Sequence, residues 1–448
     1  MSGSSSRKRP YGGDEEITDK LDLLREPPTQ SQVTGGRWTF HRVADLNPTA
    51  ADLRIVVSRS EEEFTDLSES LIVLTYQITQ ANGNNLDNNP NNVAVNQGDF
   101  GDLLFSSGQM RINNTLVEYV DNYGIVGYTQ TLLSTTPAAK RTRLSAEGWF
   151  EDDARGTNNA TNAAAETARK RKIIGSRVQT LVLKPKFALC QQRRMFPPGT
   201  EFEFLLKRSS KAFFLSGAND AAANGVALKV LSAEMRVRRY SVDGQVYAAM
   251  LTAATGAGST STDQASGQFV YPYKAIDTTE HTITAGTTSH TISIPNVKKP
   301  NKVLVLFLTQ AAHAGAPASN PVHFENLTIS QAELKFDGVP VDQEINCDFR
   351  AGGSTDRAYA NLFEVAFRVS KHDAHGVDVT EFRDRSTIFA WNTQDLIGSG
   401  VDRHQTVGLS LTFKMRDPTA NVCTALVIRE TGRRIHVGAD GTAQKDVS

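Results

Sequence analysis

Apolar and polar residues alternate with a period of two in several segments of the chain, and this pattern predicts half-buried β-strands. Residues 72–79, 201–207 and 233–238 all alternate in this way. Residues 303–308 instead form a continuous apolar run, which predicts a strand that is buried on both faces. These patterns predict a protein built mainly from strands.

One short pattern occurs twice. Residues 109–117 contain two apolar segments around Asn113-Asn114, and residues 333–341 contain two such segments around Asp337-Gly338. Both dipeptides accept the positive φ angles that two-residue hairpin turns require. A helical pattern follows each hairpin, at about residues 123–133 and 356–367. Met110 corresponds to Leu334, which lies half of the 448-residue chain further on, so we predict two similar β-rich halves.

Polar segments separate the predicted strands. Residues 82–96 contain eight asparagines and predict an exposed loop. Residues 137–172 predict a long charged loop that ends in the basic run Arg169-Lys170-Arg171-Lys172. Residues 252–268 are rich in Gly, Ser and Thr, which is typical of a linker that few contacts cross.

About eight strands in each half, separated by long loops, favour a sandwich of two sheets or a jelly roll. A jelly roll also accepts large insertions between strands, because they run over the surface. We therefore predict an all-β protein with a disordered N-terminal arm (1–36), a first jelly roll (37–250), a linker (251–269), a second jelly roll (270–438) and a flexible tail (439–448).

Composition and charge exclude several classes of protein. With 48 Lys and Arg residues against 49 Asp and Glu residues, the chain as a whole is not a strongly basic nucleic-acid binder. The three cysteines, Cys190, Cys347 and Cys423, are far apart and fit neither a structural zinc site nor a disulfide framework. The longest apolar run is much too short to span a bilayer.

Basic residues gather at two places. Arg7, Lys8 and Arg9 lie in the polar N-terminal arm, where they are compatible with a nuclear-import signal or a nucleic-acid contact. Composition alone favours a solvated tail. The basic run at 169–172 has the same two interpretations, and the solvated end of a loop is favoured over an inner-surface contact to nucleic acid.

The sequence contains no recognised catalytic or phosphate-binding motif. His372-Asp373-Ala374-His375 comes nearest to a metal-binding pattern, but no third ligand is evident, and an exposed loop is the favoured interpretation. We therefore predict no catalytic, cofactor-binding or metal site, and a binding or structural protein rather than an enzyme.

Several of these segments resemble a family of virus-derived proteins of the adintovirus, Polinton and adomavirus type. The segments that carry the resemblance are residues 63–68, 109–117, 128–134, 198–213, 233–238, 271–273 and 386–391. Their order along the chain, over about residues 60 to 435, matters more than any one of them. The first predicted helix departs from the family pattern, because Gly124 and Gly127 replace stronger helix formers. Asp121 or Asn122 is expected to cap that helix.

The resemblance implies a viral capsid protein with two tandem eight-stranded antiparallel jelly rolls, a double jelly roll with short helices and long loops. It implies pseudo-hexagonal homotrimers that tile an icosahedral shell around a DNA genome. The partners it implies are neighbouring capsomers, together with penton and minor capsid proteins. The basic arm, Arg7 to Arg9, would either face the interior, where it can contact DNA without sequence preference, or bind neighbouring capsomers. The location implied is the virion, with assembly in the host nucleus as a further expectation.

Other functions stay open at this point. The chain is also compatible with a minor capsid protein, or with an adhesion or carbohydrate-binding protein made of two β-sandwich modules. A hydrolase on a β-sandwich scaffold is disfavoured, because it would need acids and histidines that converge in space.

Overall fold

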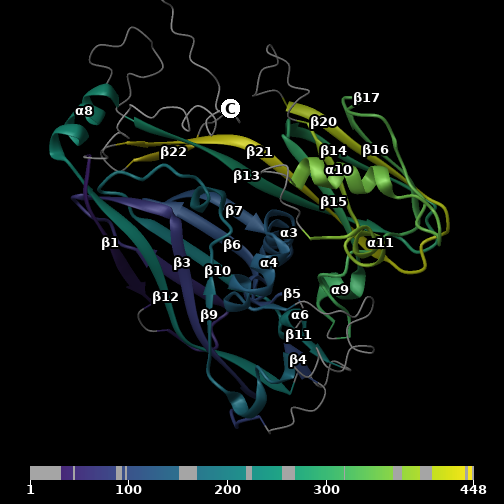
Figure 1. Ribbon diagram of the computed structural model, residues 1–448, viewed down its shortest axis with the longest axis horizontal. Helices are drawn as coiled ribbons and strands as arrows, with labels where there is room; N and C mark the ends of the chain where they lie inside the picture. Colours follow the sequence, from purple (N-terminus) through teal and green to yellow (C-terminus); the bar gives the residue numbers. More distant parts are fainter. Residues whose placement is uncertain are drawn as a thin grey trace, which may run out of the picture.

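The chain folds into two β-rich halves that lie side by side (Figure 1). A computed structural model describes residues 32–43, 46–86, 93–95, 98–150, 169–217, 225–254, 268–316, 318–366, 376–393, 406–438 and 442–445. The main strands of the first half are β1 (Val33–Arg42), β2 (Asp52–Val57), β3 (Glu63–Gln80), β6 (Phe105–Ile112), β7 (Thr115–Asp121), β9 (Gln179–Leu183), β10 (Phe202–Arg208) and β12 (Val226–Val242). Those of the second half are β13 (Gln268–Ile283), β14 (Ser289–Lys298), β15 (Lys302–Thr309), β16 (Ile329–Phe336), β17 (Val339–Pro340), β19 (Ile388–Asn392), β20 (Thr406–Met415) and β21 (Cys423–Gly438).

These strands form two antiparallel sheets in each half. In the first half, sheet 1A has the order β1-β12-β3-β9 and sheet 1B the order β2-β10-β6-β7. In the second half, sheet 2A has the order β13-β21-β15-β19 and sheet 2B the order β14-β20-β16-β17. Along the chain, the strands of both halves enter their sheets in the same sequence, A, B, A, B, B, A, B, A. The halves therefore share one jelly-roll topology, and the predicted double jelly roll is confirmed.

The repeated hairpin occupies the same place in both halves. Its strands are β6 and β7 in sheet 1B, and β16 and β17 in sheet 2B. The turn residues have positive φ angles, 45° at Asn113, 67° at Asn114, 50° at Asp337 and 82° at Gly338. These values are those of the two-residue turns that match the twist of antiparallel strands, so the predicted turn chemistry is confirmed.

The shorter elements connect or flank the sheets. The helices are α2 (Phe100–Leu103), α3 (Tyr123–Ser134), α4 (Pro137–Arg141), α6 (Lys211–Phe214), α8 (Gly244–Ala254), α9 (Gln310–Ala314), α10 (Asp356–Ala366) and α11 (Val379–Asp384), with short 3₁₀ turns η1 (Arg143–Ala146), η2 (Ile174–Ser176) and η3 (Ala188–Cys190). The short strands are β4 (Val93–Val95), β5 (Gly98–Asp99), β8 (Trp149–Phe150), β11 (Leu215–Gly217), β18 (Ile345–Asn346) and β22 (Ala443–Lys445). The helices α3 and α10 confirm the helical patterns that follow the two hairpins. Within the described part of the chain, no helix is both long and apolar enough to cross a membrane.

The core fills the space between the two sheets of each half. In the first half Met110 of β6 pairs with Phe204 of β10, and both side chains are fully buried. In the second half the rings of Phe307 and Phe413 meet edge to face, with centroids 5.1 Å apart. One continuous hydrophobic cluster contains residues of both halves, so the two jelly rolls do not pack as separate modules.

Two predicted loops contain regular structure. In the segment predicted as an exposed loop at 82–96, the strand β4 pairs with β11, and Leu86 is buried. In the segment predicted as a charged loop at 137–172, α4, η1 and β8 form a compact unit. Lys140 and Arg169 are buried there, and the ammonium of Lys140 lies 5.4 Å from the centre of the Trp149 ring. The loop prediction was wrong at Lys140 and Arg169, because their long apolar stems can pack while the charged group finds a partner.

Three strands and helices extend into segments that were predicted as an arm or a linker. The strand β1 begins at Val33, within the residues assigned to the N-terminal arm, and α8 reaches Ala254, within the predicted linker. The strand β13 then begins at Gln268. The domain boundaries themselves stay a prediction.

The three cysteines, Cys190, Cys347 and Cys423, are all free and buried. Burial raises the pKa of all three thiols, to about 12 for Cys347 and about 11 for Cys423. They therefore pack as small apolar side chains.

The internal repeat predicts a matched response to mutation. Met110→Ala and Leu334→Ala each remove a fully buried side chain at equivalent hairpin positions. We expect each to lower the free energy of unfolding by about 2–5 kcal/mol. Leu116→Ala is the control, because Leu116 of the first hairpin is 39% exposed. It should lower the free energy of unfolding by less than about 0.5 kcal/mol. Urea unfolding measures all three, and a neutral Leu334→Ala would contradict equivalent cores.

Candidate functional site

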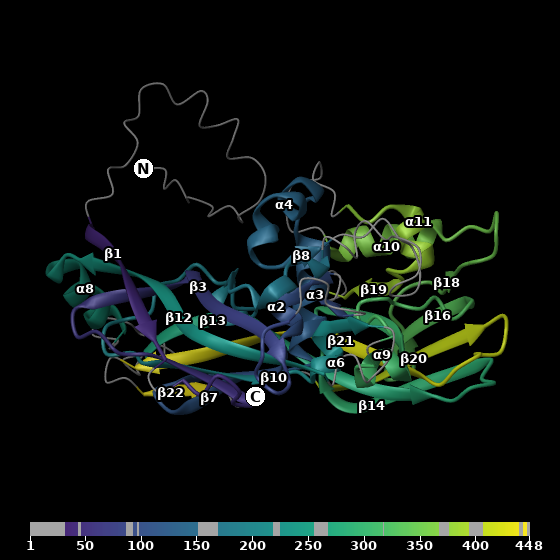
Figure 2. The same ribbon diagram turned by 90° about the horizontal axis from the view of Figure 1, so that it is seen from below.

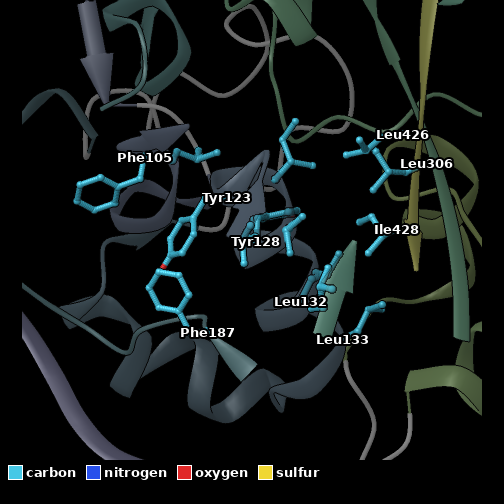
Figure 3. Close-up of a cluster of buried hydrophobic side chains, with 14 of the residues drawn as sticks. Phe105, Tyr123, Tyr128, Leu132, Leu133, Phe187, Leu306, Leu426 and Ile428 are labelled. Atoms are coloured by element: carbon cyan, nitrogen blue, oxygen red, sulfur yellow. The ribbon is translucent and has the colours of Figure 1, made fainter. Parts of the chain in front are cut away.

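The helix α3 lies between the two jelly rolls and is the centre of their junction (Figures 1 and 2). Every residue of α3 is buried except Gln130 and Ser134. In Figure 3 its side chains Tyr128, Leu132 and Leu133 lie toward Leu306, Leu426 and Ile428 of the second half. A helix that is apolar all round is stable only when protein surrounds it, so α3 requires both halves.

This arrangement explains the continuous apolar run of β15. Val303, Val305 and Phe307 alternate with Leu304, Leu306 and Leu308 along the strand. The Phe307 ring packs inside the roll against Phe413, whereas Leu306 lies on the face toward α3 (Figure 3). The strand β15 is therefore covered on both faces along most of its length, as the sequence predicted.

The two glycines of α3 allow its close contact with α2 and β6. A Cβ atom on Gly127 would lie 2.5 Å from Oδ2 of Asp102, and one on Gly124 would lie 3.0 Å from Cα of Leu103. Distances this short do not occur between real side chains, so only glycine fits at Gly127. The departure of this helix from the family pattern therefore has a packing cause. Asn122 precedes the helix in a left-handed conformation and its side chain makes no capping bond, so it does not cap the helix as the sequence suggested. Its Nδ2 instead donates to Oε1 of Glu280 in the second half, 2.6 Å away.

A buried cluster of charged groups lies beneath α3. The ammonium of Lys186 is 3.3 Å from Oδ2 of Asp102 and 3.5 Å from Oε2 of Glu147. It also donates to Oγ1 of Thr131 on α3 at 2.9 Å. Asp99 completes the cluster, and all of these side chains are buried. The cluster joins α2, α3 and the segment before η3, so its contacts fix their relative positions.

The environment sets the protonation of this cluster. Burial raises the pKa of Asp102 well above its usual range, and the negative charge of Asp99 raises it further. Burial also raises the pKa of Asp99 and of Glu147. Burial alone would lower the pKa of Lys186, but the charges of Asp102 and Asp99 outweigh that effect and raise it. A proton is therefore held on the Asp99–Asp102 pair, and Lys186 stays charged.

A second group of contacts joins β13 to the first half. The rings of Tyr271 and Phe196 stack with centroids 4.3 Å apart, and the Tyr271 hydroxyl donates to the carbonyl oxygen of Met195 at 3.0 Å. Arg194 donates to the carbonyl oxygen of Val270 at 2.7 Å. The Tyr271-Pro272-Tyr273 segment, which the resemblance singled out, therefore anchors the second jelly roll on the first.

Glu118 of β7 is a buried acid at the same junction. Its carboxylate accepts from the amides of Ala188 at 2.8 Å and Leu189 at 3.4 Å. Burial raises the pKa of Glu118 to about 7, against the opposing effects of these amides and of Arg433 and Lys445 from the second half. Glu118 thus changes its charge near neutral pH.

A cavity of about 540 Å³ opens at the junction. Both halves line it, and its polar lining includes Thr131, Arg143, Lys184, Lys274, Lys302 and Glu430. Among the described residues there is no group of three or more metal-ligating side chains. The charged groups beneath α3 pair with Lys186, and these contacts hold α2, α3 and the segment before η3 together.

The site residues that the sequence singled out lie elsewhere. Arg7, Lys8 and Arg9 of the basic arm, and His372 and His375 of the metal-like pattern, fall outside the described residues. The groups at the junction were missed. Asp102 follows Phe100 and precedes two leucines, and an acid in so apolar a segment was the signal that could have identified it.

No protein-family model matches the chain, and no curated protein matches its sequence. Solved structures do match its fold over nearly the whole length. A chain of the Sputnik virophage structure matches with a TM-score of 0.62 and 12% identity, over 100% of this chain and 95% of that one. A chain of the PBCV-1 virus capsid matches with a TM-score of 0.59 and 10% identity, over 95% of this chain and 99% of that one. The major capsid protein of mavirus matches with a TM-score of 0.50 and 10% identity, over 100% of this chain and 96% of that one. At such identities the likeness establishes the double jelly-roll fold alone.

The close contact at Gly127 predicts a strong effect of one methyl group. Gly127→Ala should lower the free energy of unfolding by about 1–3 kcal/mol, because the added Cβ overlaps the Asp102 carboxyl. Gly244→Ala is the matched control, since a Cβ there meets nothing within 4 Å. Urea unfolding at one fixed protein concentration compares the two variants. Equal stabilities would contradict the packing role of Gly127.

Glu118 predicts a pH dependence of stability. Its pKa is about 7 in the folded protein and has an ordinary value of 4.5 when exposed, so the folded state binds the proton more tightly. Its contribution is full below pH 4.5 and is lost as the pH rises through about 7, by about 3 kcal/mol in total. Glu118→Gln cannot titrate. The difference in unfolding free energy between the wild type and this variant should therefore shrink by that amount between pH 4.5 and 7.5, and parallel curves would exclude this role of Glu118.

Proposed function

We propose that this chain is a structural viral capsid protein, and that it acts by forming homotrimers that tile an icosahedral shell. The observation that carries the proposal is the repeat of one jelly-roll topology in both halves. The same fold matches chains of the Sputnik virophage and of the PBCV-1 capsid, and the major capsid protein of mavirus, nearly end to end. No chemistry at the junction suggests a reaction, so a non-enzymatic role is part of the proposal.

The internal repeat supplies the physical reason for a trimer. Three chains around one axis present six jelly rolls of the same topology, so a trimer has the outline of a hexagon. Hexagonal units tile a surface with neighbours on all six sides. The junction at α3 favours this use, because it holds the two rolls of one chain in a single arrangement.

The alternative of two independent adhesion or carbohydrate-binding modules is disfavoured by the same junction. Independent modules would each bury their own core. Here α3 packs on α2 and β6 of its own half on one side, and Leu306, Leu426 and Ile428 of the other half cover it on another.

Finer assignments belong to the proposal as well. The sequence segments that resemble the adintovirus, Polinton and adomavirus proteins support a place in that group. The likeness in fold to the major capsid protein of mavirus supports a major rather than a minor capsid role. Neighbouring capsomers, penton and minor capsid proteins are the expected partners in the virion. The basic arm with Arg7, Lys8 and Arg9 is expected to face the interior and to contact the DNA genome, with nuclear import as its other candidate role.

The mass of the purified protein tests the proposal. We expect light scattering to give three times the chain mass of 48.8 kDa, and negative-stain images to show hexagonal particles. Removal of residues 1–31 should leave this trimer intact and reduce its binding to DNA at low salt. A protein that stays monomeric at every concentration would refute the proposed assembly.

A further inference from the structure

The outer faces of the two equivalent sheets, 1A and 2A, differ in what covers them. On sheet 2A, Leu306, Leu426 and Ile428 are buried against α3. On sheet 1A, Phe40 is 56% exposed and Trp38 is 39% exposed. Within the part of the chain that the structure describes, the outer face of sheet 1A at β1 and β12 therefore lacks the cover that β15 and β21 have on sheet 2A.

The exposed face of sheet 1A is an ordered ladder of arginines and aromatic rings. Arg236 of β12 lies over the ring of Phe40 at 5.3 Å. Arg238 lies 5.3 Å from the Trp38 ring and 5.5 Å from the Tyr240 ring. In the register of the sheet these residues face one another across β1 and β12, while Met235 and Val237 point into the core. Aromatic and arginine side chains that are held in place before binding are the types that dominate protein interfaces.

The helix α10 is the counterpart of α3, since each follows the repeated hairpin. It has a different surface: Ala358, Leu362 and Val365 are buried, whereas Asp356, Ala360 and Glu364 are exposed. The exposed residues are four apart and share one face of the helix. That face presents two acids on either side of a small residue. It is complementary in charge to Arg238 and to Arg236, whose guanidinium also pairs with Glu234 at 3.2 Å, and it can lie close to a flat sheet.

The two surfaces cannot meet within one chain. Both views of the molecule place β1 near one end of the first half, and α10 in the other half (Figures 1 and 2). A contact between them therefore requires a second copy of the chain. Such a head-to-tail contact uses two different surfaces on every copy and can close into a ring.

We propose that the outer face of sheet 1A, defined by Trp38, Phe40, Arg236 and Arg238, binds the exposed face of α10 from a second copy. The contact repeats between chains the arrangement that α3 and sheet 2A have within one chain. This inference rests on the proposed self-assembly and adds the two surfaces and the charges that join them.

Charge reversal tests the inference. Arg236→Glu and Glu364→Arg should each raise the concentration at which half of the trimer dissociates by at least about tenfold, because each places like charges together. The double variant, with both substitutions in one chain, should recover most of the wild-type affinity. Light scattering over a dilution series measures the dissociation, and circular dichroism confirms that each variant is folded.

Two controls separate this surface from general effects. Arg59→Glu reverses an arginine whose side chain is 67% exposed, and it should leave the trimer unchanged. Phe40→Ser should weaken the trimer, whereas Val339→Ser, which removes a 65% exposed apolar side chain from sheet 2B, should not.

Each remaining outcome has a clear meaning. A wild-type protein that never forms trimers refutes the proposed function itself. A wild-type trimer that Arg236→Glu, Glu364→Arg and Phe40→Ser all leave unchanged overturns this inference alone. If the trimer is lost only when residues 1–31 are removed, the outer face of sheet 1A binds the N-terminal arm instead of α10. That result would also overturn this inference.

Discussion

The fold depends on the burial of α3 between the two jelly rolls. Ten of its residues are buried, and the other two, Gln130 and Ser134, line the cavity at the junction. Burial of that many apolar side chains is favourable only when both jelly rolls close on the helix. The two halves are therefore bound to one relative position. The geometry of this junction therefore determines how the outer surfaces of one jelly roll lie relative to those of the other.

Charged groups lie beside α3, and their burial lowers the stability of the folded state. Bringing Lys186, Asp102, Asp99 and Glu147 out of water is unfavourable, and their mutual attraction only partly offsets it. What the cluster contributes is directional contact: Lys186 donates to Thr131 of α3 and pairs with Asp102 of α2, which ties the two helices to the segment that carries Lys186. An apolar cluster of the same volume would hold the helix at less cost and allow it to slide.

The sequence predicted the parts of the fold that local patterns encode. Alternating residues located β3, β10 and β12, and the dipeptides Asn113-Asn114 and Asp337-Gly338 located the turns, because a single residue or pair sets the local backbone. The junction could not be predicted in this way. The ion pair of Lys186 with Asp102 and the contact of Gly127 with Asp102 join residues that are distant in sequence, and only packing brings them together. Lys140 and Arg169 were misjudged for the same reason, since their charge suggested solvent while their stems pack in the interior.

The burial of the three thiols determines how the folded protein responds to oxidising surroundings. Cys190, Cys347 and Cys423 are enclosed, and burial keeps their thiolate forms unfavourable. Oxidants and disulfide partners react with accessible thiolates. The folded chain can therefore move from reducing to oxidising surroundings without a covalent change, and its durability comes from packing that redox conditions do not alter.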